Sequence, residues 1–209
     1  MPKNKPFLRR QIRSYMQRRV NEQEVRQRFL IVCEGTKTEP IYFEQFRVPG
    51  LVIQLERTGR NTISLVEEAL KLRREGEYDQ VWCVFDKDDF SIDQFEQAIQ
   101  VAVNNRMKVA YSNQAFELWY VLHFCYMQNA NGREAYREML NRFLGFKYEK
   151  NDPRMYQILF SKMDTAIENA RRLIEEYHPC RPGRDDPSTR VHELIQELRE
   201  QAKPLMKRD

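Results

Sequence analysis

Residues 29–40 read Phe-Leu-Ile-Val-Cys-Glu-Gly-Thr-Lys-Thr-Glu-Pro, an apolar run that ends abruptly in a polar and charged turn. Five consecutive apolar residues, several of them β-branched, are typical of a strand covered on both faces, as in a parallel sheet. Thr38 is a suitable N-cap for a helix with Pro40 in its first turn. The stretch therefore predicts a buried strand over 29–33, a short turn and a helix that runs to Phe46.

The same succession of strand and helix recurs along the chain. Three further apolar runs, each followed by residues at helical spacing, are Leu51–Leu55, Val81–Phe85 and Met107–Tyr111. Four strand–helix units in a row favour an α/β fold, with a mostly parallel four-stranded sheet flanked by helices. Ser91 and Gln94 form a capping-box signature for one of these helices. A long apolar helix is expected from Phe116 to about Tyr126.

After Asn131 the pattern is helical throughout. Apolar stripes at helical spacing run over 135–143, 163–177 and 191–198. The segment 178–187 holds three prolines and alternating charges, which indicates an ordered surface loop or a lid, and Ser188 or Thr189 would cap the helix that follows. These patterns predict three parts of the chain. They are a basic N-terminal arm (1–27), an α/β domain (28–130) and a helical extension packed on that domain (131–209).

Composition narrows the class of protein. The chain has 209 residues and is 41% hydrophobic, with twelve Phe and ten Tyr, which excludes an intrinsically disordered protein. The longest apolar runs are about five residues, whereas a membrane helix needs about 20. The four cysteines are far apart and only three histidines are present, so neither a disulfide framework nor a zinc site is indicated. We expect a soluble cytoplasmic protein without membrane contact.

Positive charge is concentrated in the N-terminal arm. Residues 1–28 hold nine Lys or Arg against two Glu, a net charge of +7, so the total of +4 leaves −3 for the rest of the chain. Such an arm favours contact with a phosphate backbone or an acidic partner, and a solvated tail is the alternative. The arginines proposed for nucleic-acid binding are Arg9, Arg10, Arg13, Arg18 and Arg19 in the arm, with Arg181 and Arg184 in the loop.

Acidic residues follow the predicted strands. In an open parallel sheet, ligands bind beyond the carboxyl ends of the strands. The acidic residues placed there are Glu34 and Glu39 after the first strand, Asp86 and Asp88 after the third, and Glu117 after the fourth. Converging carboxylates without His or Cys favour Mg²⁺ or Mn²⁺, and two such ions about 4 Å apart could clamp a phosphodiester. Each acid taken singly could instead be an ordinary helix start.

Two common catalytic motifs are missing from the sequence. The chain lacks the G-x-x-x-x-G-K-[ST] phosphate loop, which argues against an NTPase, and the G-x-S-x-G nucleophile motif of hydrolases. Lys37 and Lys87 flank the predicted acidic site. Either could neutralise negative charge that develops on a phosphorane-like transition state, and a solvated lysine is the alternative.

Four segments carry a resemblance to a known family. A strand ending in Glu34-Gly35, with Asp86-x-Asp88 ending a later strand, resembles the Toprim fold of topoisomerases, primases and OLD-family nucleases. The segments EGTKTEPIYF (34–43), FDKD (85–88), SNQAFELW (112–119) and DPSTRV (186–191), in this order, resemble the RloB family. The similarity covers roughly residues 28–200.

The resemblance implies a Toprim-type metal site in a nuclease. It implies that Glu34 is a metal ligand or general acid/base, that Asp86 and Asp88 are metal ligands, and that Glu39 and Glu117 are supplementary ligands. Family members are restriction-linked proteins, often encoded beside an ABC-type ATPase in anti-phage defence, which implies a nuclease effector in abortive infection that cleaves DNA or RNA such as tRNA. Many Toprim sequences have Asp after a shorter gap at the place of Glu39, so one ion or two stays open.

Two other interpretations are kept. One is a catalytically silent or regulatory Toprim-like subunit that binds a partner protein or a nucleotide signal. The other is a receiver-like phospho-acceptor domain, which also has aspartates after strands but would not need the helical extension. The sequence leaves the substrate, the trigger of activity and the oligomeric state open, a homodimer included.

Overall fold

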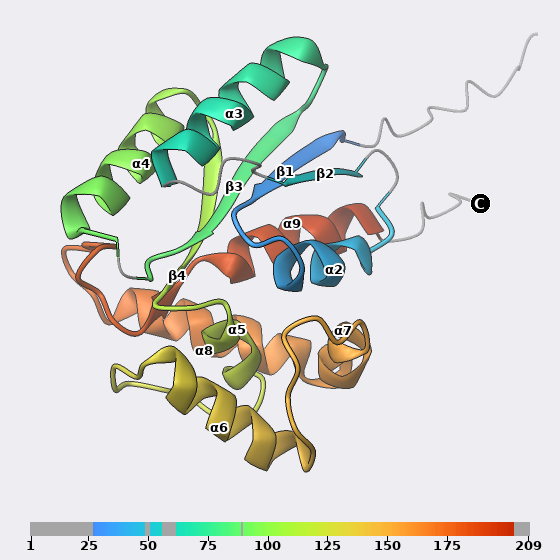
Figure 1. Cartoon of the computed structure of the whole chain (residues 1–209), viewed down its shortest axis with the longest axis vertical. Coiled ribbons are helices and arrows are strands. Elements are labelled where there is room, and N and C mark those ends of the chain that lie inside the picture. Colours follow the sequence, from blue (N-terminus) through green and yellow to red (C-terminus); the bar gives the residue numbers. More distant parts are fainter. Residues whose placement is uncertain (1–26, 49–50, 56–61, 89, 203–209) are drawn as a thin grey trace, which may run out of the picture.

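The computed structural model describes residues 27–48, 51–55, 62–88 and 90–202, and its centre is a five-stranded sheet (Figure 1). The sheet order is β2-β1-β3-β4-β5. The strands are β1 (Phe29–Cys33), β2 (Leu51–Leu55), β3 (Gln80–Asp86), β4 (Lys108–Asn113) and β5 (Ser188–Thr189). The first four are parallel and β5 pairs antiparallel with β4. The predicted α/β class is confirmed, with one short strand more than the sequence indicated.

The sheet order places a topological switch point between β1 and β3. The chain leaves β1 toward β2 on one side and returns to β3 on the other side of β1. Crevices for ligands form outside the carboxyl ends of strands at such a point. The Glu34 amide continues the ladder by donating to the Val84 carbonyl over 2.9 Å, so the residues after β1 and β3 start side by side.

One face of the sheet is covered by α3 (Thr62–Glu75) and α4 (Ile92–Asn104), which lie above it in Figure 1. Alternate strand residues such as Leu30 and Val32 point to this face because side chains in a strand change sides at each residue. The predicted cap of α4 is confirmed, since Ser91 Oγ accepts a hydrogen bond from the Gln94 amide over 3.3 Å.

The other face carries the remaining helices of the described residues. They are α2 (Thr38–Glu44), α5 (Glu117–Val121), α6 (Arg133–Leu144), α7 (Met155–Leu159), the short 3-10 helix η1 (Phe160–Lys162), α8 (Met163–Glu175) and α9 (Val191–Ala202). In Figure 1, α2 and α9 lie directly beneath the sheet, with α5, α6, α7 and α8 below them. One hydrophobic cluster runs from Ile31 and Trp82 of the sheet to Leu140 and Leu173 of the helical extension. No helix in the described part is long and apolar enough to cross a membrane.

Two local predictions were wrong. The helix expected from Phe116 to Tyr126 spans only Glu117–Val121, because Asn169 of α8 donates to the Leu122 carbonyl over 2.8 Å and occupies a group that a longer helix would use. Thr38 does not cap α2, since its hydroxyl donates to the Lys150 carbonyl over 2.7 Å.

The predicted cap of the last helix is partly different. Ser188 and Thr189 form the edge strand β5, which the sequence did not indicate. Thr189 nevertheless accepts a hydrogen bond from the Val191 amide, at the start of α9, over 3.2 Å. All four cysteines are free thiols, and Cys33 and Cys83 are buried within β1 and β3.

Candidate functional site

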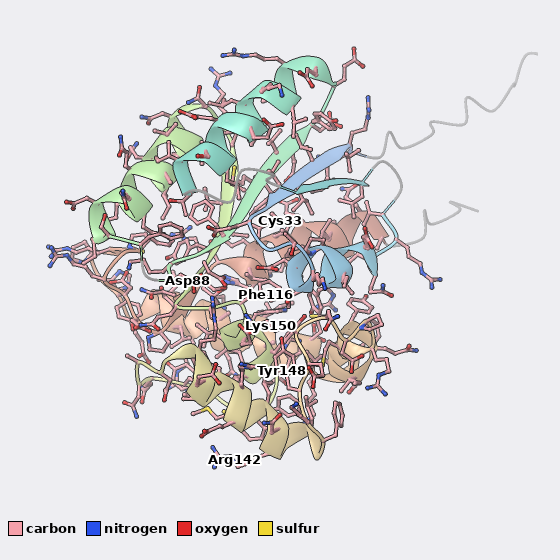
Figure 2. All side chains as sticks on the ribbon, viewed as in Figure 1. Cys33, Asp88, Phe116, Arg142, Tyr148 and Lys150 are labelled. Carbon is pink, nitrogen blue, oxygen red and sulfur yellow. The ribbon has the colours of Figure 1, made fainter. Side chains whose placement is uncertain are left out.

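A pocket of about 530 Å³ opens at the switch point, between the carboxyl ends of β1 and β3 and the helical extension. Figure 2 shows Asp88, Phe116 and Lys150 gathered where the sheet meets the lower helices. The charged residues that line the pocket are the acids Glu34, Glu39, Asp86, Asp88 and Glu117 and the bases Lys37, Arg133 and Lys150. The structure thus brings together all five acidic residues that the sequence indicated. We call this feature the acidic pocket.

Glu34 and Asp86 come from the ends of neighbouring strands and contact each other. The Asp86 amide donates to Glu34 Oε2 over 3.3 Å. The Asp86 side chain is only 13% exposed. Its burial raises the pKa of Asp86 well above the usual value, and the charges of Glu39 and Glu117 raise it further. An ionised Asp86 is therefore costly in this pocket unless a cation compensates its charge.

Asp88 turns back toward the pocket instead of continuing the strand. Its φ is 39°, in the left-handed region that aspartate tolerates better than most residues, and its amide donates to the Gln114 carbonyl over 3.1 Å. Between the two aspartates, the Lys87 ammonium donates to the Phe90 carbonyl. Asp86 and Asp88 therefore line the pocket, whereas Lys87 makes a local contact and does not line it, so its catalytic role stays a prediction.

Glu39 and Glu117 form a buried acidic pair on the other side of the pocket. Their residues are 6% and 2% exposed. Burial, with a smaller contribution from the charge of Glu117, raises the pKa of Glu39 to about 7, although a hydrogen bond from its own amide and the charges of Lys150 and Arg133 act in the opposite direction. A Cβ atom at Gly35 would lie 1.9 Å from Glu39 Oε2, so only glycine leaves room for this carboxylate.

Two basic residues of the helical extension complete the pocket, and the sequence analysis missed both. Arg133 opens α6, where its Nη2 contacts Asp88 Oδ1 and lies 3.5 Å from Asp86 Oδ2. Lys150 Nζ lies 3.8 Å from Glu117 Oε1. One signal in the sequence was a basic residue in the first turn of a helix, where the helix dipole favours acidic ones.

The other basic residues proposed from the sequence are not gathered at the pocket, except Lys37, which is exposed and lines it. Arg181 and Arg184 are exposed on the loop after α8 and do not line the pocket. The end of β4 holds this loop, because the side-chain Nδ2 of Asn113 donates to the Asp185 carbonyl over 3.0 Å. The arginines that the sequence indicated in the N-terminal arm lie outside the described residues; they are Arg9, Arg10, Arg13, Arg18 and Arg19.

The donor set of the pocket fits a hard divalent cation. Every side chain with a negative charge is a carboxylate, no His or Cys lines the pocket, and oxygen ligands of this kind suit Mg²⁺ or Mn²⁺. The ligands are not yet arranged around an ion, since among the described residues no three acidic, His or Cys side chains converge on one position. Arg133 instead bridges Asp86 and Asp88.

Comparison with known protein families identifies a match that covers most of the chain. The sequence model of a family described as RloB-like protein matches residues 29–198, which include the whole sheet and all the charged residues of the acidic pocket. No curated protein and no solved structure matches the chain.

Proposed function

The chain belongs to the RloB-like protein family, and we propose that it is a nuclease that uses Mg²⁺ or Mn²⁺ to hydrolyse phosphodiester bonds of nucleic acid. The observation that carries this proposal is the acidic pocket at the switch point. Five carboxylates face one pocket there, two of them with raised pKa values, which is a costly arrangement for a fold alone. Such strain is typical of a functional site whose charge is balanced by a ligand.

Each acidic residue has a role in this proposal. Asp86 and Asp88, with Glu34, would hold the cation, and Glu39 with Glu117 would hold a second one. The bound cation would lower the pKa of a water molecule and polarise the scissile phosphate. In the reaction the oxygen of a water molecule would form a bond to phosphorus while the bond from phosphorus to the leaving sugar oxygen breaks, and that oxygen would take up a proton from solvent. Glu34, which lines the pocket at the end of β1, would accept the proton released by the attacking water.

The basic residues would bind the substrate. Lys37 stands at the mouth of the pocket, where an ammonium group can neutralise charge on the phosphate in the transition state. The N-terminal arm, with its net charge of +7 over residues 1–28, would add contacts to the phosphate backbone that do not depend on sequence. We expect RNA such as tRNA, or DNA, as the substrate.

The proposal extends to the cellular role. The resemblance of the four sequence segments to restriction-linked proteins supports a nuclease effector in anti-phage defence, held or triggered by an ABC-type ATPase. In such a system the ATPase would control when the pocket meets its substrate. The assay of the function therefore includes an ABC-type ATPase if one is encoded beside the chain.

The test is a cleavage assay on plasmid DNA and on total tRNA, with Mg²⁺, Mn²⁺ or EDTA. We expect cleavage that depends on the divalent cation and is lost in Asp86→Ala and Glu34→Ala. Glu134→Gln is the control, since this acid is 77% exposed on α6 and does not line the pocket. Cleavage of equal rate in Asp86→Ala would refute the assignment of the site.

A second candidate is a regulatory subunit without catalysis. The contact of Arg133 with Asp86 and Asp88 favours it, because an arginine in this place balances the aspartates without any ion. This candidate predicts no cleavage with any partner or cation, and no binding of Mn²⁺ in calorimetry. The same set of proteins therefore distinguishes the two functions.

A further inference from the structure

Arg133 occupies the place where a cation would bind the two aspartates. A single nitrogen atom, Nη2, contacts Asp88 Oδ1 and lies 3.5 Å from Asp86 Oδ2. These two oxygens belong to the D-x-D pair that the proposed function assigns to a metal ion. Arg133 Nη2 lies between these two oxygens, so a divalent cation bound by both of them would have to take its place.

The rest of the guanidinium is poorly satisfied. Arg133 Nε is buried and has no hydrogen-bond partner among the described residues. An unpaired buried donor is costly, whereas guanidinium groups bind carboxylates and phosphates best through two parallel hydrogen bonds. The present contact uses Nη2 and leaves Nε unused. The guanidinium is thus held by its attraction to the two carboxylates more than by well-aligned hydrogen bonds.

Arg133 stands at the start of a helix and is partly open to solvent. It is the first residue of α6, preceded by Gly132 at the N-cap, and its side chain is 35% exposed. Release from the aspartates would leave the guanidinium at the pocket wall, next to the place of a scissile phosphate. There Nε and one Nη could donate together to two phosphate oxygens.

We propose that Arg133 is an exchangeable cation of this site: it holds Asp86 and Asp88 in the ion-free protein, yields them to a divalent cation, and then binds the substrate phosphate. The inference rests on the proposed nuclease function and deepens it by assigning a residue of the helical extension to substrate binding. It accounts for the absence, among the described residues, of three acidic side chains converging on one position, since Arg133 now separates two of them.

The test measures Mn²⁺ affinity without nucleic acid, by calorimetry on the full chain. In Arg133→Gln the competing cation is gone, so we expect Mn²⁺ to bind at least ten times more tightly than in the wild type. Arg133→Lys keeps the charge but not the fork, and an intermediate affinity is expected. Arg142→Gln is the matched control, because Arg142 lies further along α6, is exposed and does not line the pocket. Its affinity should equal that of the wild type.

A second readout separates exchange from a fixed salt bridge. At saturating Mn²⁺, Arg133→Gln should cleave at least tenfold more slowly and with a higher KM, since the phosphate ligand is missing. If the wild type binds Mn²⁺ and Arg133→Gln binds it with the same or a weaker affinity, this inference is overturned and the nuclease proposal stands. Absence of Mn²⁺ binding in every variant, the wild type included, would overturn both. Thermal unfolding of each variant in EDTA verifies that it is folded.

Discussion

The substitution Glu39→Gln should stabilise the protein, and it should do so only where Glu39 would otherwise be ionised. The side chain is buried beside Glu117, and its pKa is raised from 4.5 to about 7. A carboxyl with a raised pKa favours folding fully below its unfolded value, and this contribution is lost as the pH rises through the folded value. Glutamine has nearly the same shape as glutamate but does not ionise, so it does not carry the cost of a buried negative charge.

The magnitude follows from the size of the shift. A rise of about 2.5 pKa units costs the folded state about 3 kcal/mol at pH 8, where Glu39 is ionised, and less than about 1 kcal/mol at pH 5. For a chain of this size about 3 kcal/mol corresponds to a rise in Tm of roughly 6 to 12 °C. Glu39→Gln should therefore gain this much at pH 8 and little at pH 5.

The assay is thermal unfolding in EDTA from pH 5 to pH 8, repeated with Mg²⁺ at pH 8. With Mg²⁺ we expect the order to reverse, because the cation stabilises the wild type by binding its carboxylates and has one ligand fewer in the variant. Glu134→Gln, an exposed acid on α6, should show no pH-dependent gain. Equal stabilisation of Glu39→Gln at pH 5 and pH 8 would refute the claim that burial makes the ionised form of Glu39 costly in the folded protein.

Two further substitutions test the packing around the pocket. Gly35→Ala places a Cβ 1.9 Å from Glu39 Oε2, but that oxygen ends a flexible side chain, so the fold should survive. We expect the affinity for Mn²⁺ to fall about tenfold, or about 1.4 kcal/mol. An affinity equal to that of the wild type in calorimetry would contradict the packing argument. Leu173→Ala shortens a fully buried side chain of α8 and should lower the free energy of unfolding, measured in urea, by about 2 to 5 kcal/mol. Val103→Ala, at a residue that is 56% exposed, should lower it by less than about 0.5 kcal/mol. Similar losses for both would show that the cluster joining the sheet and the helical extension is not a close-packed core.

The sheet and its acidic edge were predictable because their signals are local. Apolar runs such as Phe29–Cys33 mark strands covered on both faces, and parallel strands must bring their carboxyl ends together. The edge strand β5 was not predictable, since two residues carry no periodicity and pair with β4 only after α8 has turned the chain back. The end of α5 was equally hidden, because it depends on Asn169, far away in sequence.

The basic residues of the pocket show the same limit. Arg133 and Lys150 lie in a segment whose sequence indicates only amphipathic helices, and nothing in it states which side chains meet the sheet. Their position follows from tertiary contacts, such as the hydrogen bond from the Thr38 hydroxyl to the Lys150 carbonyl. The acidic residues at the strand ends could therefore be predicted from the sequence, whereas the basic residues that balance their charge could not.

The site consequently crosses the boundary that composition suggests near residue 130. Five carboxylates and three basic side chains line the pocket, a formal charge of −2, which one divalent cation neutralises. Without the helical extension, and so without Arg133 and Lys150, the same pocket would carry −4, and the apolar face of Ile31 and Trp82 would lose α9, one of the two helices directly beneath it. A fragment of residues 28–130 would thus face both an open core and unbalanced acids. The helical extension is therefore part of the site, and the charge it places on the carboxylates sets how strongly they bind an ion.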